Sequence, residues 1–448
     1  MPYIPHTEDD IKLMLDTVGK KDLKDLFISI PSKYRLKEKG LNLSFGLSEY
    51  DAKEKVSSLA EKNNMVSSRK SFIGAGAYYH QIPSAVNHVV MRSEFYTAYT
   101  PYQPEISQGT LQAIFEFQTM MCRITGMDVS NASMYDGATA MAEAVLVAYR
   151  YKRGKKNTVI IPDNIHPEYL AVLDNYVSPF GINISKLKYD NKTGEIDTAD
   201  FKAKLSDALA VVVQSPNFFG VLESKASEIT KLAKEHDVVS ICTVVESTSL
   251  GLFKSPGELG FDIAVLEIQS LGNPVAFGGP HAGVICAKKE ILRFMPGRIV
   301  GETKDVDGNR AYVLTLATRE QHIRREKATS NICSNQALVA LRTAVYLSMI
   351  GEKGYRDMAT INYNHAHYAK EALEKLGATI KYKGTFYNEF LLELNSKDVM
   401  DRVYNGLKTA GFIPGYRLGD KQLLITVTEC QKTEDIDNYV ENFGRSLN

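Results

Sequence analysis

The fold class can be argued from one stretch, Phe261-Asp-Ile-Ala-Val-Leu-Glu-Ile-Gln-Ser-Leu-Gly-Asn-Pro-Val-Ala-Phe-Gly-Gly-Pro-His281. It opens with a continuous apolar run, Ile263–Leu266, passes through a polar turn at Gln269-Ser270 and reaches a Gly-Gly pair. A short apolar run without alternation, bounded by turn residues, is typical of a strand that is buried on both faces. Strands of that kind belong to parallel sheets, which helices cover on both sides.

Five further runs of the same kind occur around this stretch. They are Thr158–Ile161, Ile182–Leu187, Leu209–Gln214, Val238–Val244 and Gly283–Ala287. Helical patterns such as Pro167–Tyr176 and Ser224–His236 separate several of them. Strands that alternate with helices in this way predict an α/β domain built on a mostly parallel sheet.

Three parts are expected along the 448 residues. Residues 1–65 form an N-terminal helical extension, in which Thr7 and Ser48 are predicted N-caps. Residues 66–315 form a large α/β domain that includes a long loop at 71–105, where periodicity is weak. Residues 316–448 form a small α+β domain, because long helices at about 319–348 and 353–376 precede two strand-like runs and a closing helix near 433–446.

Composition excludes several classes of function. Lys+Arg and Asp+Glu both number 53, so no net field would steer the chain toward nucleic acid or a membrane surface. The five cysteines are scattered and odd in number, which argues against a disulfide framework and against a metal site. No apolar run approaches the ~20 residues of a membrane span, and the N-terminus lacks the layout of a signal peptide. We therefore expect a cytoplasmic protein without bound metal, nucleic acid or membrane.

Asp136 opens an alanine-rich helix that is predicted over Ala138–Tyr149. Small residues at a helix N-terminus can expose backbone N–H groups to a phosphate. However, Asp136 is well placed to be the N-cap, and its carboxylate would then hold the position that a phosphate needs. The residues favour a structural cap over a working phosphate site.

Glu246 follows the buried strand Val238–Val244. In pyridoxal-phosphate enzymes of this layout, an acid at the end of such a strand pairs with the pyridinium nitrogen of the cofactor. Glu246 suits that role, and it suits equally well the capping of the turn that follows. Both interpretations stay open from the residues alone.

The polar turn Gln269-Ser270 stands where such an enzyme would carry its Schiff-base lysine. There is no lysine between Lys254 and Lys288. Lys254 precedes a surface turn and Lys288 follows the next strand, so neither is a good replacement. Without an amine at this position, the chain cannot hold the cofactor as a Schiff base.

Three tyrosines fall at a spacing of three between two prolines and an acid. The segment contains Tyr96, Tyr99, Tyr102, Gln103 and Glu105. Pro101 and Pro104 oppose a helix, and a polyproline-II path has three residues per turn. We therefore expect an extended ridge of aromatic side chains, which either contributes to a site or packs as a surface loop with its hydroxyls in water.

Several long motifs closely resemble the P-protein of the glycine cleavage system, in particular the first of the two chains into which some organisms split it. The resemblance spans essentially the whole chain. Its motifs are Thr97-Ala-Tyr-Thr-Pro-Tyr-Gln-Pro-Glu-Ile-Ser-Gln-Gly109, Asn131-Ala-Ser-Met-Tyr-Asp-Gly-Ala-Thr-Ala140, Pro216-Asn-Phe-Phe-Gly220, Gln269-Ser-Leu-Gly272, Phe277-Gly-Gly-Pro280 and Thr329-Ser-Asn-Ile-Cys333.

This resemblance implies a fold-type-I pyridoxal-phosphate architecture like that of aspartate aminotransferase. It also implies an α2β2 assembly with a second, paralogous chain whose lysine holds pyridoxal phosphate, while this chain binds none. Glycine would be decarboxylated at the α/β boundary, and the aminomethyl group would pass to the lipoyl arm of the H-protein. The family often has Asp where Glu246 stands and Gly where Glu267 stands.

The site residues follow from the same resemblance. Asp136, Glu246, Gln269 and Ser270 are expected to form a vestigial cofactor site, which we call the vestigial-site residues. Tyr96 to Glu105 is the expected contribution to the shared site. Two alternatives remain open from the residues: an independent pyridoxal-phosphate decarboxylase or transaminase that uses Lys254, and a purely structural partner subunit.

Overall fold

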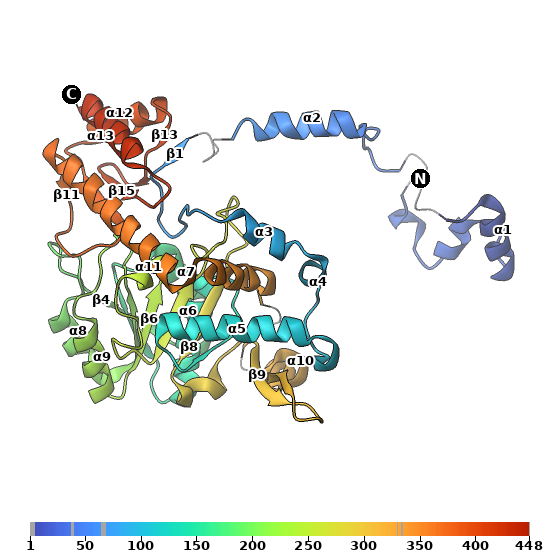
Figure 1. The fold of residues 1–448 in the computed structure, drawn as a ribbon. Helices are drawn as coiled ribbons and strands as arrows, with labels where there is room; N and C mark the ends of the chain where they lie inside the picture. The colour runs from blue at the N-terminus through green and yellow to red at the C-terminus, as the bar shows by residue number, and fades with distance from the viewer. Residues whose placement is uncertain (1–4, 37–39, 64–68, 329, 333–334, 448) are drawn as a thin grey trace. The chain divides into compact units, whose positions relative to one another are not determined.

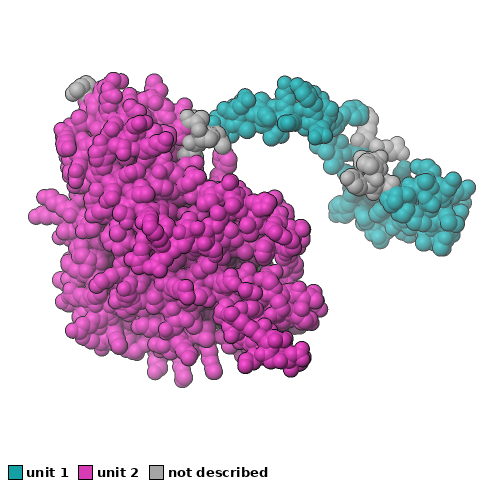
Figure 2. Space-filling view, viewed as in Figure 1, with its two compact units in different colours: residues 1–64 teal, residues 65–448 magenta. Residues whose placement is uncertain are grey.

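The computed structural model describes residues 5–36, 40–63, 69–328, 330–332 and 335–447. The chain divides into two compact units, residues 1–64 and residues 65–448, which are coloured separately in Figure 2. We call them the N-terminal unit and the main unit. The further boundary expected at 315/316 stays a prediction. Of the motif at 329–333, Thr329 and Cys333 lie outside the described residues.

The N-terminal unit consists of short capped helices. α1 spans Glu8–Thr17 and α2 spans Glu49–Ala60, with two 3-10 helices, Leu23–Phe27 and Ser32–Tyr34, between them. The side chain of Thr7 accepts from the N–H of Asp10, and the side chain of Ser48 accepts from the N–H of Asp51. Both predicted N-caps are confirmed.

A seven-stranded sheet is the centre of the main unit (Figure 1). Its order is β2-β8-β7-β6-β5-β3-β4, in which β4, β3, β5, β6 and β7 run parallel and β8 runs antiparallel to both neighbours. The strands are β2 (Val129–Ser130), β3 (Thr158–Pro162), β4 (Asn183–Leu187), β5 (Ala208–Gln214), β6 (Val239–Val244), β7 (Ile263–Glu267) and β8 (Gly283–Ala287). The predicted strands and the mostly parallel sheet are confirmed.

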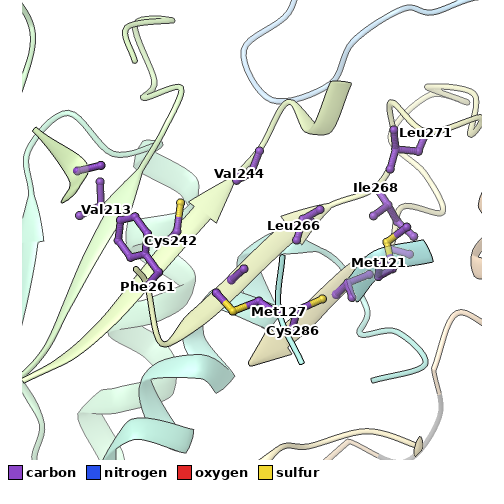
Figure 3. Packing of buried hydrophobic residues seen from close by; sticks show 14 of the residues in the cluster. Met121, Met127, Val213, Cys242, Val244, Phe261, Leu266, Ile268, Leu271 and Cys286 are labelled. Carbon is purple, nitrogen blue, oxygen red and sulfur yellow. The ribbon is translucent and has the colours of Figure 1, made fainter. Parts of the chain in front are cut away.

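Helices cover both faces of this sheet. Successive side chains of each strand point to opposite sides, so the apolar strands have to be packed on both faces. In β7, Ile263 and Val265 pack into the cluster formed with α6 (Gly137–Tyr151) and α7 (Pro167–Val177). Ala264 and Leu266 join the opposite cluster, part of which Figure 3 shows. That cluster contains residues of α3 (Ser84–Val90), α5 (Gln108–Thr125), α8 (Thr198–Lys204), α9 (Ala226–Glu235) and α11 (Ala337–Lys375).

The C-terminal part carries a second, antiparallel sheet of four strands in the order β11-β12-β15-β14. These are β11 (Thr379–Ile380), β12 (Glu389–Glu393), β14 (Tyr416–Leu418) and β15 (Gln422–Thr426). α12 (Lys397–Thr409) and α13 (Thr433–Leu447) pack on it. A hairpin of β9 (Ile299–Lys304) and β10 (Arg310–Thr315) precedes α11.

Two sequence predictions about helices are wrong. The helix expected at about 319–348 begins only at Ala337, because the short helix α10 (Gln321–Arg324) ends at Arg325, whose φ is 54°. The break expected between the two helices is confirmed, since α11 is kinked at Gly351, whose backbone is not helical. The segment 71–105 is also not a plain loop, since it contains α3 and α4 (Ser93–Tyr96), and β1 (Lys70–Ser71) pairs in parallel with β13 (Phe412–Ile413).

Candidate functional site

Ligands of open α/β sheets bind outside the carboxyl ends of the parallel strands. Here β6 leads into Glu246, and β7 ends at Glu267 just before Gln269. The N-terminus of α6, with Asp136 as its N-cap, faces the same edge through a contact between Gly137 and Glu267. The structure therefore brings the vestigial-site residues to one edge of the sheet.

The N-terminus of α6 is closed by the carboxyl groups of this chain. Asp136 Oδ1 accepts from the Thr139 N–H at 2.7 Å, and the Thr139 hydroxyl accepts from the Asp136 N–H. Glu267 Oε2 accepts from the Gly137 N–H at 2.9 Å. A Cβ on Gly137 would overlap the Tyr169 hydroxyl, so the helix end is also packed from the side. Asp136 is the cap that the sequence predicts.

Glu267 occupies a small pocket of backbone donors. Its Oε1 accepts from the N–H of Gln269 at 2.9 Å and from the N–H of Ala282 at 3.3 Å. Burial raises the pKa of Glu267 to about 8, and the three N–H groups act in the opposite direction. A carboxyl group thus fills the position at the helix N-terminus where small anions usually bind.

Glu246 is paired with an imidazole from the same chain. His80 Nε2 lies 3.3 Å from Glu246 Oε2, and His80 Nδ1 lies 2.9 Å from Glu429 Oε2. Burial lowers the pKa of His80, but the carboxylates of Glu429 and Glu246 outweigh it and raise the pKa to about 10. His80 is therefore an imidazolium at neutral pH, and both ring nitrogens donate. Glu246 also caps the next turn by accepting from the Thr248 N–H at 2.9 Å, which is the capping role that the sequence left open.

The side-chain amide of Gln269 forms two hydrogen bonds with the backbone of Tyr78, as a neighbouring strand would. Its Oε1 accepts from the Tyr78 N–H at 2.8 Å, and its Nε2 donates to the Tyr78 carbonyl at 2.9 Å and to the Asn273 carbonyl at 2.8 Å. Ser270 is buried beside it, and its hydroxyl has no hydrogen-bond partner among the described residues. The amide at position 269 is thus fully used inside the chain.

Residues 74–81, which we call the 74–81 segment, run between the two sheets. The Ala75 N–H donates to Glu389 Oε1 at 2.8 Å, and the Tyr78 hydroxyl donates to Glu389 Oε2 at 3.1 Å. The Gln81 N–H donates to Glu429 Oε1 at 2.7 Å. Glu389 lies on β12 and Glu429 follows β15, so this segment ties the edge of the large sheet to the C-terminal sheet.

Residues 96–105, which we call the tyrosine loop, do not form the extended ridge predicted from the sequence. Tyr96 closes the helix α4, and Pro104 opens a 3-10 helix, Pro104–Ile106. The expected polyproline-II path is wrong because the Arg92 and Ser93 carbonyls accept helical hydrogen bonds from Tyr96 and Thr97. Tyr99 is nevertheless 84% exposed, and Gln103 and Glu105 are also exposed.

A hollow of about 240 Å³ lies against this loop. Its lining is mostly apolar and includes Phe95, Tyr96, Tyr99, Phe117, Arg298 and Leu341. Arg298 is buried, and its Nη2 donates to the Tyr102 hydroxyl at 3.4 Å while Nη1 donates to Asn335 at 2.8 Å. α11, which lines the hollow with Leu338 and Leu341, also contacts the loop after β7, since the Thr343 hydroxyl accepts from the Asn273 side chain at 2.9 Å. An exposed tyrosine over an apolar hollow with a cation at its wall suits contact with another molecule.

Three other features were looked for in the described part of the chain: a replacement lysine, a metal site and a membrane span. Lys254 is exposed next to the turn at Ser255. No group of three or more His, Cys, Asp or Glu side chains in the described ranges could hold a metal ion. Within the same ranges, no helix is both long and apolar enough to cross a bilayer.

Similar solved structures define the class of protein. A Burkholderia pseudomallei sphingosine-1-phosphate lyase matches with a TM-score of 0.68 at 14% identity, over 92% of this chain and 93% of that chain. The alanine–glyoxylate aminotransferase of a Nostoc species matches with a TM-score of 0.60 at 14% identity, over 94% of this chain and 100% of that one. These likenesses show the fold alone: the chain has the α/β fold of the fold-type-I pyridoxal-phosphate-dependent enzymes.

Nearer comparisons show the family. A family model described as "Glycine cleavage system P-protein" matches residues 1–443. The chain is 47% identical to a probable glycine dehydrogenase (decarboxylating) subunit 1 of Desulfitobacterium hafniense and 46% identical to one of Geobacillus thermodenitrificans, covering 99% and 98% of those proteins and 99% of this chain in each case. A crystal structure of the inhibitor-bound glycine decarboxylase (P-protein) of the glycine cleavage system matches all of both chains, at 39% identity and a TM-score of 0.90. The chain belongs to the glycine cleavage system P-protein family.

Proposed function

We propose that this chain is subunit 1 of a two-chain glycine dehydrogenase (decarboxylating), and that it acts only together with a lysine-bearing subunit 2. The relatives that match over nearly their full length carry the name "subunit 1", which implies a second subunit. The proposed assembly is α2β2, with glycine as substrate and the lipoylated H-protein as the acceptor of the aminomethyl group. The proposed compartment is the cytoplasm, in keeping with the free thiols of Cys122, Cys242, Cys286 and Cys430.

One observation carries this proposal: the vestigial site does not fit pyridoxal phosphate. The cofactor needs a lysine amine for its aldehyde, an acid that pairs with its ring nitrogen, and donors for its phosphate. The turn has Gln269 and Ser270 in place of a lysine, and Gln269 is bonded to Tyr78. Glu246 is paired with His80, and Glu267 accepts from the Gly137 N–H. These contacts support the proposal that this chain does not itself hold the cofactor.

The division of labour follows from this misfit. Subunit 2 is proposed to hold pyridoxal phosphate covalently, and the cofactor there supplies the electron sink for the loss of CO2 from glycine. Subunit 1 is proposed to contribute Tyr96, Tyr99, Tyr102, Gln103 and Glu105 at the boundary between the chains. The exposure of Tyr99 and the hollow beside it support this part of the proposal, since a partner can cover them.

The proposal is tested by reconstitution. The purified chain is expected to show no pyridoxal absorbance and no glycine decarboxylation, and the mixture with subunit 2 is expected to release CO2 from glycine and load the H-protein. Borohydride reduction of the mixture followed by peptide mapping should find the pyridoxyl adduct on subunit 2. Turnover by the lone chain, or an adduct on Lys254, would show instead an independent pyridoxal-phosphate enzyme.

The tyrosine loop gives a separate prediction. Tyr99→Phe in the assembled complex is expected to lower kcat/KM about tenfold, because a lost hydrogen bond in a closed site costs roughly 1–1.5 kcal/mol. Tyr102→Phe is expected to have a smaller effect, since its hydroxyl already accepts from Arg298. Steady-state kinetics on complexes checked for intact stoichiometry would measure both.

A matched control separates chemistry from packing. Tyr416 is a partly exposed tyrosine on β14 of the C-terminal sheet, and Tyr416→Phe is expected to leave kcat/KM unchanged. If Tyr99→Phe and Tyr102→Phe also leave kcat and affinity unchanged in an intact complex, the loop acts only as interface packing. That result would favour the structural-partner alternative for this loop.

A further inference from the structure

A buried arginine lies under the tyrosine loop. Arg298 is 5% exposed, although it belongs to the wall of the hollow that Tyr96 and Tyr99 also line. Its Nη2 donates to the Tyr102 hydroxyl at 3.4 Å, and its Cζ lies 5.7 Å from the centre of the Tyr102 ring. A guanidinium within about 6 Å of an aromatic ring is attracted to it, and more strongly where water is excluded. Arg298 therefore contacts both the hydroxyl and the ring of one tyrosine of the loop.

The backbone that carries Arg298 is fixed from two sides. The Ala132 N–H donates to the Arg298 carbonyl at 2.8 Å. The nearby Val300 exchanges two backbone hydrogen bonds with the Gln118 side chain, at 2.9 and 3.0 Å. All four residues are buried. Because Ala132 follows β2 and Gln118 lies in α5, these bonds join the start of β9 to two other elements of the main unit. The guanidinium is thus presented from a rigid base.

The guanidinium of Arg298 is oriented as well as placed. Its Nη1 donates to Asn335 Oδ1 at 2.8 Å, and Asn335 Nδ2 donates to the Ala132 carbonyl at 3.5 Å. A guanidinium is planar, so bonds at Nη1 and Nη2 together fix the direction in which it points. Asn335 precedes α11, and Ala132 follows β2. The contact with Tyr102 is therefore set by groups of this chain, before any partner binds.

The rings of the tyrosine loop are half or more exposed. Tyr99 and Tyr102 are 84% and 50% exposed, and the Tyr102 N–H donates to the nearby Thr100 carbonyl at 2.8 Å. Segments with exposed side chains and short-range bonds open easily. The bond from Arg298 is of another kind, because it joins Tyr102 to a residue 196 positions further along the chain. It fixes the loop to a distant part of the main unit.

We propose that Arg298 is a positioning residue, which holds the tyrosine loop through Tyr102 so that Tyr99 is presented to subunit 2 in an ordered conformation. This inference rests on the proposed function, in which the loop contributes to the shared site. Ordering a loop at the moment of binding costs conformational entropy, and a loop that is already ordered avoids that cost. Arg298 is buried and acts through Tyr102, so its role needs no contact with glycine or the cofactor.

The first test uses the full chain without its partner. The sequence contains no tryptophan, so Tyr99→Trp places a single indole in the loop. We expect Arg298→Met in this background to lower the residual fluorescence anisotropy of the indole by about a third, as in a change from an ordered to a mobile segment. Arg319→Met is the matched control, because Arg319 donates to the carbonyls of Leu316 and Gly297. It should leave the anisotropy unchanged.

A second variant approaches the same contact from the loop. Tyr102→Leu removes the ring and the hydroxyl at a half-exposed position, and it should lower the anisotropy as much as Arg298→Met does. It replaces Arg298→Met if circular dichroism shows that the latter does not fold. In the assembled complex, Arg298→Met is expected to lower kcat/KM about fivefold, but less than about twofold when Tyr102→Leu is already present. Such non-additivity is expected of a residue that acts through Tyr102.

Three results would overturn the inference. They are an unchanged anisotropy in Arg298→Met and Tyr102→Leu, an equal fall in Arg319→Met, which would indicate general loosening, and additive effects of Arg298→Met and Tyr102→Leu on kcat/KM. The proposed function is judged separately. If the wild-type mixture with subunit 2 does not release CO2 from glycine, the proposed function fails, and the anisotropy of the isolated chain still decides whether Arg298 holds the loop.

Discussion

Replacing His80 with leucine is expected to lower the free energy of unfolding by about 3–5 kcal/mol, because two carboxylates would lose the cation that pairs with them in the interior. Glu246 is buried, and the side chain of Glu429 is only 14% exposed. Urea denaturation followed by circular dichroism would measure the change. His88→Leu is a matched control, since His88 is exposed on α3, and it should change the free energy by less than about 0.5 kcal/mol.

The pH dependence of this effect has a definite sign. The pKa of His80 is raised from 6.5 to about 10, so the folded protein binds this proton more tightly than the unfolded chain does. The stabilisation by His80 is then fully present below about pH 6.5 and declines as the pH rises through about 10. The difference in unfolding free energy between wild type and His80→Leu should shrink accordingly. A difference that stays constant between these pH values would contradict the imidazolium.

Gln269→Lys is expected to produce neither cofactor binding nor activity in the isolated chain, although it places an amine in the turn Gln269-Ser270, where the fold class carries its Schiff-base lysine. A lysine has no acceptor for the Tyr78 N–H and cannot repeat the paired bonds of the amide. Leaving buried backbone groups without partners costs about 1–3 kcal/mol for each group, so the variant should also be less stable by roughly 2–4 kcal/mol. Absorbance titration with pyridoxal phosphate and thermal unfolding would test the two parts.

Gln269→Met separates the two effects. It removes the same hydrogen bonds without adding an amine, so it should show the loss of stability and no reaction with the aldehyde. If Gln269→Lys instead formed a stoichiometric Schiff base with pyridoxal phosphate, the site would be open, and our account of Glu267 and His80 would be wrong.

The sequence predicted the elements whose signal is local. The buried strands, the helices α6, α7 and α9, and the caps at Thr7, Ser48 and Asp136 can each be predicted from about ten residues. The helix boundaries near α10 were wrong because positive φ at Leu316 and Arg325 confines the helix to a short stretch between them. The path of the tyrosine loop was wrong because spacing alone does not reveal where a short helix such as α4 ends.

The partners of the vestigial-site residues could not be predicted in this way. His80 lies 166 positions from Glu246 and 349 from Glu429, and Gln269 lies 191 positions from Tyr78. No periodicity in one sequence joins such distant groups. The lack of lysine near position 269 was visible in the sequence, but the reason that the space is filled was not. The contact of Glu267 with the N-terminus of α6 had one signal in the sequence: Glu267 is an acid at a position where the glycine cleavage P-proteins often have glycine.

The 74–81 segment has a consequence for how this subunit persists in the cell. A protein that binds its cofactor gains stability with the concentration of free cofactor, by mass action. In this chain the groups that tie the sheet edge to the C-terminal sheet are covalently part of the polypeptide, so their effective concentration never changes. Under the proposed function, in which subunit 2 alone holds pyridoxal phosphate, the folded population of this chain would not depend on the concentration of that cofactor.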